Sequence, residues 1–246
     1  MEVIEFIKGD SHIGLVTRNG VAGPEQELLA AFKSFIPSCF RWRRGAVAIF
    51  HEPQLETGFP DLVAVQYVPE TFNQWSRYRC QLTPLELKVL HHLYRVRGAD
   101  SASLMSTLGI DARRLLAAIE RLLDANMITR SRARWVPRPL KSVFGLRAIV
   151  AVEAKIKNWS DAFRQGELNR WFASESYVLS PINKPTRSVS ERSLRTGVGI
   201  LLLNGSRVRR FQSAQKSCIP ASYGSWMFNE WIGRCLNTGE RRIACK

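Results

Sequence analysis

The stretch AIVAVEAKI, at residues 148–156, is an almost unbroken apolar run interrupted only by Glu153 and Lys155. Such a run is typical of a strand that is buried on both faces in the middle of a sheet. Because residues two apart on a strand point to the same face, Glu153 and Lys155 should project together, roughly 7 Å apart, while Ala154 points the other way. Charged groups are costly to bury, so this pair needs a specific reason to be there.

The segments before this strand supply a second acidic residue. Apolar runs at 46–50 and 62–68 are too short for helices and are predicted to be strands. The second run follows Asp61 in the turn sequence Gly58-Phe59-Pro60-Asp61. If the strand after Asp61 is a neighbour of the strand that carries Glu153, the two carboxylates converge.

Helices and further strands are predicted on either side of these segments. A helix is expected from Pro24 to Ile36, because its apolar residues line one face and Pro24 suits a first helical position, with Pro37 ending it. After the central strand we expect a helix from Ser160 to about Phe172, strands at 177–179, 198–203 and 207–211, and a last helix at 221–236. Asn204-Gly205 is a typical hairpin turn. Outside residues 82–139, the chain is therefore predicted to be an α/β domain.

Residues 82–139 have a different, helical pattern. Thr83-Pro84-Leu85-Glu86 predicts a capping box at the start of a first helix. Ser101 is predicted to cap a second helix that Gly109 ends, and Asp111 to cap a third. The apolar face of the third helix consists of Leu115, Leu116, Ile119, Leu122 and Leu123. Two short strands at 127–129 and 134–136 are then expected around a basic tip.

This order of three helices and a basic hairpin resembles the winged helix-turn-helix family. The resemblance implies an inserted module at 82–139 that divides the α/β core into residues 1–81 and 140–246. Winged modules usually place the third helix in the major groove and the hairpin on the backbone or minor groove, which implies duplex DNA as the partner. The residues expected to contact DNA are Arg113, Arg114, Arg121, Arg130, Arg132 and Arg134. An ordinary solvated face and a protein-binding module are the alternatives.

The composition favours a polyanionic partner. Lys and Arg number 36 against 21 Asp and Glu, a formal net charge of +15. Such an excess of positive charge raises the local concentration of polyanions. Nucleic acid is the first candidate partner, and an anionic membrane surface is the second. No apolar run reaches the roughly 18 residues of a membrane span, and the acidic start is unlike a secretory signal. We therefore expect no membrane insertion and a cytoplasmic location, at the nucleoid if the source is bacterial. The five cysteines lack zinc-site spacing.

Two converging carboxylates repel each other unless a cation lies between them. A hard divalent cation with oxygen ligands is the usual solution, which makes Mg²⁺ the expected cofactor and Mn²⁺ its substitute. Such an ion neutralises charge that develops on a phosphate and lowers the pKa of a bound water, and a nearby lysine can orient that water. The residues Asp61, Glu153 and Lys155 therefore predict metal-assisted hydrolysis of a phosphodiester.

With Pro60-Asp61 and Glu153-Ala154-Lys155, the chain resembles the PD-(D/E)xK, or restriction-endonuclease-like, nucleases. The resemblance implies an α/β core with a mixed central sheet flanked by helices, and a metal-dependent DNA endonuclease, a hydrolase in which Asp61 and Glu153 bind the metal and Lys155 positions water. Many relatives carry a Gln on the helix after this motif, matched here by Gln165 as a supporting catalytic residue. Some carry an acid on the first helix, matched by Glu25 as a further metal ligand. The long gap between the two half-motifs departs from the family pattern, and the inserted module accounts for it.

Other interpretations remain open at this stage. A Glu/Lys pair on a strand is also typical of an exposed ion pair, and an Asp after Pro of a turn. A nuclease-like fold can persist after its catalytic activity is lost, and the protein would then be a non-catalytic DNA-binding regulator or assembly factor. A basic groove can bind RNA as well as DNA. Because many nucleases of this kind act as dimers, a homodimer or a partner subunit is compatible with the resemblance.

Overall fold

The structure is a computed structural model that describes residues 2–18, 20, 22–42, 44–205 and 207–237. The chain forms two compact units. Of the described residues, the first unit contains those up to Tyr67 and Leu146–Ala221, and the second contains Val68–Gly145 and 222–237. None of the helices described is both long and apolar enough to cross a bilayer.

Seven strands of the first unit, within the described residues, form one mixed sheet in the order β1-β2-β3-β6-β7-β8-β9. They are β1 (Val3–Phe6), β2 (Ala46–His51), β3 (Leu62–Tyr67), β6 (Leu146–Ala154), β7 (Glu175–Ser180), β8 (Gly199–Asn204) and β9 (Arg207–Gln212). The pairs β1–β2, β6–β7 and β7–β8 are parallel, and the other neighbours are antiparallel. The predicted α/β class with a mixed central sheet is thereby confirmed.

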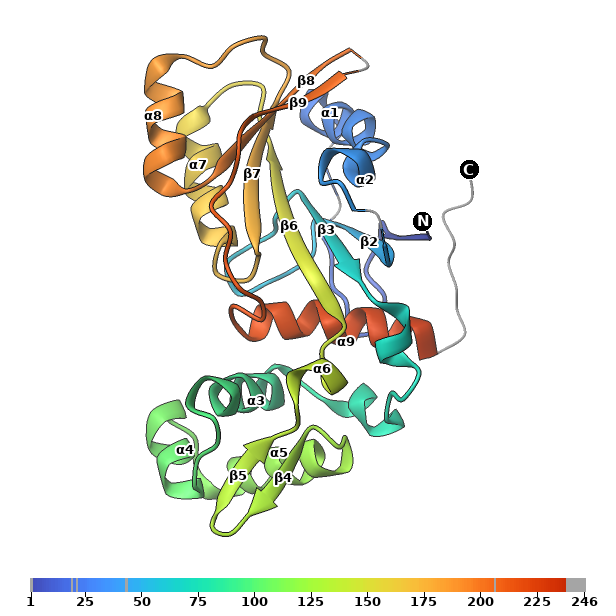
Figure 1. Ribbon diagram of the computed structural model, residues 1–246, viewed down its shortest axis with the longest axis vertical. Coiled ribbons are helices and arrows are strands. Elements are labelled where there is room, and N and C mark those ends of the chain that lie inside the picture. Colours follow the sequence, from blue (N-terminus) through green and yellow to red (C-terminus); the bar gives the residue numbers. More distant parts are fainter. Residues whose placement is uncertain (1, 19, 21, 43, 206, 238–246) are drawn as a thin grey trace. The chain divides into compact units, whose positions relative to one another are not determined.

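Helices flank this sheet on both faces (Figure 1). They are α1 (Pro24–Lys33), α2 (Ile36–Cys39), α7 (Trp159–Asn169) and α8 (Arg187–Thr196). Val152 and Ala154 of β6 pack in the apolar cluster that contains the buried side chains of α1, whereas Phe163 of α7 packs in a separate cluster with residues of β7 and β8. Because strand residues alternate between faces, Glu153 lies on the α7 side of the sheet.

Some elements of the first unit differ from the sequence prediction. The helix expected from Pro24 to Ile36 is two helices, and Pro37 lies in the first turn of α2, where its missing N–H costs nothing, rather than ending a helix. Asn158, not Ser160, caps α7, because its side chain accepts a hydrogen bond from the backbone N–H of Asp161. Strand β1 and helix α8 were not predicted. Helix α8 has no apolar stripe, since Ser193 is its buried residue.

The second unit contains three helices followed by a hairpin, in the expected order. The helices are α3 (Pro84–Val96), α4 (Ser101–Leu108) and α5 (Ala112–Asp124), and the hairpin strands are β4 (Ile128–Ser131) and β5 (Arg134–Pro137). The capping box of α3 forms as predicted, and Asp111 caps α5. Asp100, rather than Ser101, caps α4, because its carboxylate reaches the backbone N–H of Ser103. On α5, Leu116 and Leu123 are exposed instead of buried with the other leucines.

The second unit is larger than the predicted module at 82–139. It also includes the short helices η1 (Pro69–Phe72), η2 (Arg77–Gln81) and α6 (Leu140–Val143) and the long helix α9 (Tyr223–Asn237). Arg79 of η2 and Glu230 of α9 form a buried ion pair, and Gly233 of α9 lies against the ring of Trp75. The two compact units thus divide at Tyr67/Val68 and Gly145/Leu146, whereas the sequence places the module boundaries at 81/82 and 139/140, and α9 is grouped with the second unit.

Candidate active site

The two half-motifs meet where β3 begins and β6 ends. These strands are antiparallel neighbours that pair Leu62 with Val152, so Asp61, directly before β3, lies beside Glu153 on the same face. The backbone N–H of Ala154 donates a hydrogen bond to Oδ2 of Asp61 at 2.8 Å. The structure thus brings together two carboxylates that are 92 positions apart in the sequence.

Glu153 is 1% exposed, and its carboxylate is incompletely satisfied. Its Oε1 accepts a hydrogen bond from the side-chain amide of Asn169 at 2.6 Å, but its Oε2 has no hydrogen-bond partner among the described residues. Burial raises the pKa of Glu153 well above its ordinary value, and the charge of Asp61 raises it further. Burial also raises the pKa of Asp61, despite the opposing effects of the Ala154 N–H and Lys155. The buried carboxylate of Glu153 and the half-buried carboxylate of Asp61 therefore lie together without a full complement of positive charge.

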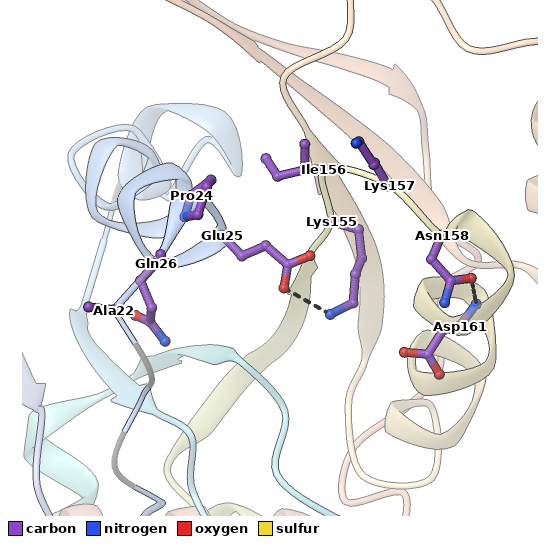
Figure 2. A pocket seen from close by; sticks show the side chains of 10 residues that line it. Ala22, Pro24, Glu25, Gln26, Lys155, Ile156, Lys157, Asn158 and Asp161 are labelled. Carbon is purple, nitrogen blue, oxygen red and sulfur yellow. Dashed lines mark hydrogen bonds and ion pairs between the residues drawn. The ribbon is translucent and has the colours of Figure 1, made fainter.

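Lys155 and Glu25 point toward each other across a cavity (Figure 2). The Lys155 ammonium donates to Oε2 of Glu25 at 3.1 Å. Burial opposes the charge on Lys155, but the hydrogen bond that it donates to Glu25 and the charges of Asp61, Glu25 and Glu153 raise the pKa of the lysine overall. Lys155 is therefore a fixed cation beside the carboxylates of Asp61 and Glu153. Glu25, expected as a metal ligand, forms an ion pair with this lysine in the structure.

Gln165 and Asn169 lie one turn apart on α7 and line a cavity of about 250 Å³ together with Glu153 and Arg18. Oε1 of Gln165 is buried and has no hydrogen-bond partner among the described residues. Asn169 was not predicted as a site residue. Its position four residues after Gln165 places it on the same helix face, which is the signal in the sequence that points to it.

The cavity that Lys155 and Glu25 border is the larger one, of about 580 Å³. It is lined by the first turn of α1, including Glu25 and Gln26, and by the segment from Lys155 to Asn158 with Asp161 (Figure 2). Lys155 therefore borders this cavity as well as the carboxylates of Asp61 and Glu153.

Glu52 is a further acidic residue that the sequence analysis missed. It directly follows β2, is 3% exposed, and its backbone N–H donates to the carbonyl of Asp61 at 3.2 Å. Its charge contributes to the raised pKa of Asp61. Its side chain accepts hydrogen bonds from Arg18 and Gln26. No motif marks Glu52, and only the antiparallel pairing of β2 with β3 places it opposite Asp61.

The six arginines expected to contact DNA divide into two groups within the second unit. Arg121 donates to buried Glu86 at 2.9 Å, and Arg134 donates to the carbonyl of Gly98, so these two hold the unit's own helices and hairpin together. All six are exposed, and Arg130 donates to the carbonyl of Arg132 at 3.2 Å within the hairpin. The others are Arg113 and Arg114 at the start of α5 and Arg132 on the hairpin.

The donor set at the junction of β3 and β6 consists of Asp61 and Glu153. Within the part of the chain that the structure describes, no three or more His, Cys, Asp or Glu side chains are grouped to hold a metal ion. Mg²⁺ is nevertheless commonly held by one or two carboxylates, with water and substrate phosphates as its other ligands. The unpartnered Oε2 of Glu153 beside Asp61 fits that chemistry.

Comparisons of the chain with models of protein families, with curated proteins and with solved structures find no match. The function of this chain is therefore inferred from the chemistry of the site.

Proposed function

We propose that this chain is a Mg²⁺-dependent nuclease that hydrolyses phosphodiester bonds in duplex DNA, with Mn²⁺ able to replace Mg²⁺. The observation that carries the proposal is the buried Glu153, whose Oε2 is unpartnered beside a second carboxylate, Asp61. A protein keeps two such groups together only at a cost, because each disfavours the ionised form of the other. A divalent cation offsets this repulsion and satisfies the open oxygen.

The residues around the carboxylates have complementary roles in this proposal. A bound divalent cation supplies neutralising charge and a water of lowered pKa. Asn169 fixes Oε1 of Glu153, which would leave Oε2 available to hold the cation. Lys155, held by Glu25, orients the attacking water and stabilises negative charge that develops on the phosphate. Gln165 presents a buried oxygen to the cavity of about 250 Å³ that Glu153 also lines, where this oxygen can accept a hydrogen bond from water.

The first unit would then be a restriction-endonuclease-like core, and the second a winged helix-turn-helix module that binds the duplex. Three observations support the DNA-binding role: the order of three helices and a hairpin, the exposed arginines on α5 and on the β4–β5 hairpin, and the net charge of +15. Lys and Arg on such a surface displace counterions from the phosphate backbone.

The test is metal-dependent cleavage of supercoiled plasmid in Mg²⁺, Mn²⁺ or EDTA. We expect the wild-type protein to nick or linearise the plasmid in either metal. Asp61→Asn keeps the size of the side chain and an acceptor for Ala154 but removes the charge, and should lower the rate at least about 100-fold. Glu167→Gln removes an exposed carboxylate of α7 outside the site and should cleave normally. Equal cleavage by Asp61→Asn would overturn the proposal, and tight duplex binding without any cleavage would favour a non-catalytic regulator.

A further inference from the structure

The segment that carries Arg18 is hydrogen-bonded to the segment that connects β2 to Asp61. The backbone N–H of Arg18 donates to the carbonyl of Glu52 at 3.0 Å, and that of Gln54 donates to Val16 at 2.8 Å. Thr17 and Pro53 form an isolated β-bridge between these two hydrogen bonds. The main chain of Arg18 is therefore fixed relative to the candidate active site.

The Glu52 carboxylate orients the guanidinium of Arg18. Its Oε2 accepts from Nε of Arg18 at 2.5 Å, and its Oε1 accepts from the side-chain amide of Gln26 at 2.8 Å. Glu52 also has φ of 44°, a left-handed conformation that is uncommon for residues other than glycine. Such conformations are strained and concentrate at functional sites. The buried Glu52, whose backbone is strained, thus holds the exposed side chain of Arg18 in place.

The guanidinium of Arg18 borders the cavity that contains Glu153. Its side chain is 57% exposed, lies 5.4 Å over the ring of Phe59, and lines the cavity of about 250 Å³ with Glu153 and Gln165. Glu52 engages the Nε edge of the guanidinium. The two terminal amino groups form the planar fork that binds phosphate oxygens in pairs.

We propose that Arg18 binds the phosphate of the substrate beside the Asp61–Glu153 site, and that Glu52 is the positioning residue for Arg18. The identity of the anion as a phosphodiester rests on the proposed function. The charge balance of the site supports the assignment, because the carboxylates of Glu52, Asp61 and Glu153 would repel a phosphate that approached them without a cation. Arg18 supplies that cation at the smaller cavity.

The first test measures binding without cleavage, using a short fluorescein-labelled DNA duplex in Ca²⁺ over a range of salt concentrations. Arg18→Ala should lower the affinity at least about tenfold and reduce the slope of log affinity against log salt by about 0.9, the value for one lost phosphate contact. Arg187→Ala is the matched control, since Arg187 on α8 also donates its Nε to a glutamate, Glu191, at 2.7 Å. The control should change the affinity less than about twofold.

The second test measures cleavage of the same duplex in Mg²⁺. Arg18→Lys keeps the charge but loses the fork, and should lower kcat about 100-fold with little change in KM. Glu52→Gln should also lower kcat, but should have no further effect when Arg18 is already Lys, because it acts through Arg18. Thermal unfolding of each variant shows whether it is folded, and Arg18→Lys replaces Arg18→Ala in the binding assay if the alanine variant is not.

The two proposals fail in different ways. Unchanged affinity and unchanged salt slope in a folded Arg18 variant would overturn the role of Arg18, whether or not the wild-type protein cleaves DNA. If the wild-type protein binds the duplex without metal-dependent cleavage and the Arg18 variants still lose affinity, phosphate binding by Arg18 stands and the nuclease proposal fails.

Discussion

Glu153 is the residue at which stability and the proposed function conflict. Because its pKa is raised in the folded protein, the folded state binds the proton more tightly than the unfolded state. This contribution to stability is present below the unfolded pKa of about 4.3 and is lost as the pH rises through the higher folded pKa. We expect Glu153→Gln to stabilise the metal-free protein at pH 8 by about 1–3 kcal/mol, the cost of an unsatisfied buried polar group, and less at pH 5. Thermal unfolding in EDTA at the two pH values measures this difference.

Under the proposed function, the same carboxylate also makes metal binding dependent on pH. The pKa values of Asp61 and Glu153 are both raised. A larger fraction of the molecules therefore carries a proton on these carboxylates at pH 5 than at pH 8, and a metal ion must displace that proton. We expect the affinity for Mn²⁺, measured by calorimetry, to increase with pH, and Mg²⁺ to raise the melting temperature of the wild-type protein but not of Glu153→Gln. Metal stabilisation of equal size in the two proteins would show that the ion binds elsewhere.

At the scale of single elements, helix α5 carries the DNA-binding hypothesis. Arg113 and Arg114 are exposed at its start, whereas Arg121 is paired with Glu86. Replacing both Arg113 and Arg114 by Ala should weaken duplex binding and reduce the salt slope by about 2, because each residue contributes about one phosphate contact. Fluorescence anisotropy over a salt series measures both quantities.

Arg121→Ala is the control for this experiment. It should leave the salt slope nearly unchanged and instead destabilise the unit by less than about 1 kcal/mol, since its ion pair with Glu86 is half exposed. Unchanged affinity after the double substitution would refute recognition by α5 and favour a protein-binding role for the second unit.

The elements with strong local patterns could be predicted from the sequence, and the others could not. The capping box of α3, the cap at Asp111 and the turn at Asn204-Gly205 depend on residues within one turn of the chain, so their residue types determine them. Helix α8 gives no such pattern, because most of its residues are polar, Ser193 is its buried residue, and Val189 is only partly buried against the neighbouring apolar cluster. Strand β1 consists of four residues, too few for alternation to be distinguished from chance.

The candidate site shows the same division. Asp61 and Glu153 could be predicted because each is a charge at the end of an apolar strand. Glu52 and Arg18 could not, because their positions depend on the pairing of β2 with β3 and on a bridge between two loops. Glu25 lies beside Lys155 for the same reason, since the packing of α1 on the sheet determines which charge it meets.

At the scale of the whole molecule, the chain enters the second unit twice. It leaves the sheet after β3, returns at β6, and contributes α9 to the second unit after the sheet is complete. The contact that fixes α9 joins Arg79 to Glu230, 151 positions later, at 2.5 Å. No local pattern contains that information, which explains why α9 was assigned to the core from the sequence.

This ion pair gives the last prediction. Glu230→Ala leaves Arg79 buried without its counter-charge, although the ring of Trp75 lies 3.5 Å from its guanidinium. We expect a loss of about 3–5 kcal/mol, measured by denaturant unfolding, with faster amide exchange throughout Val68–Gly145 and α9. Arg79→Met combined with Glu230→Leu should recover much of this loss, because no buried charge is then left unpaired. Glu191→Ala, which breaks an exposed pair on α8, should cost less than about 0.5 kcal/mol. If faster exchange after Glu230→Ala were confined to α9, this helix would be an appendage of the second unit rather than part of its core.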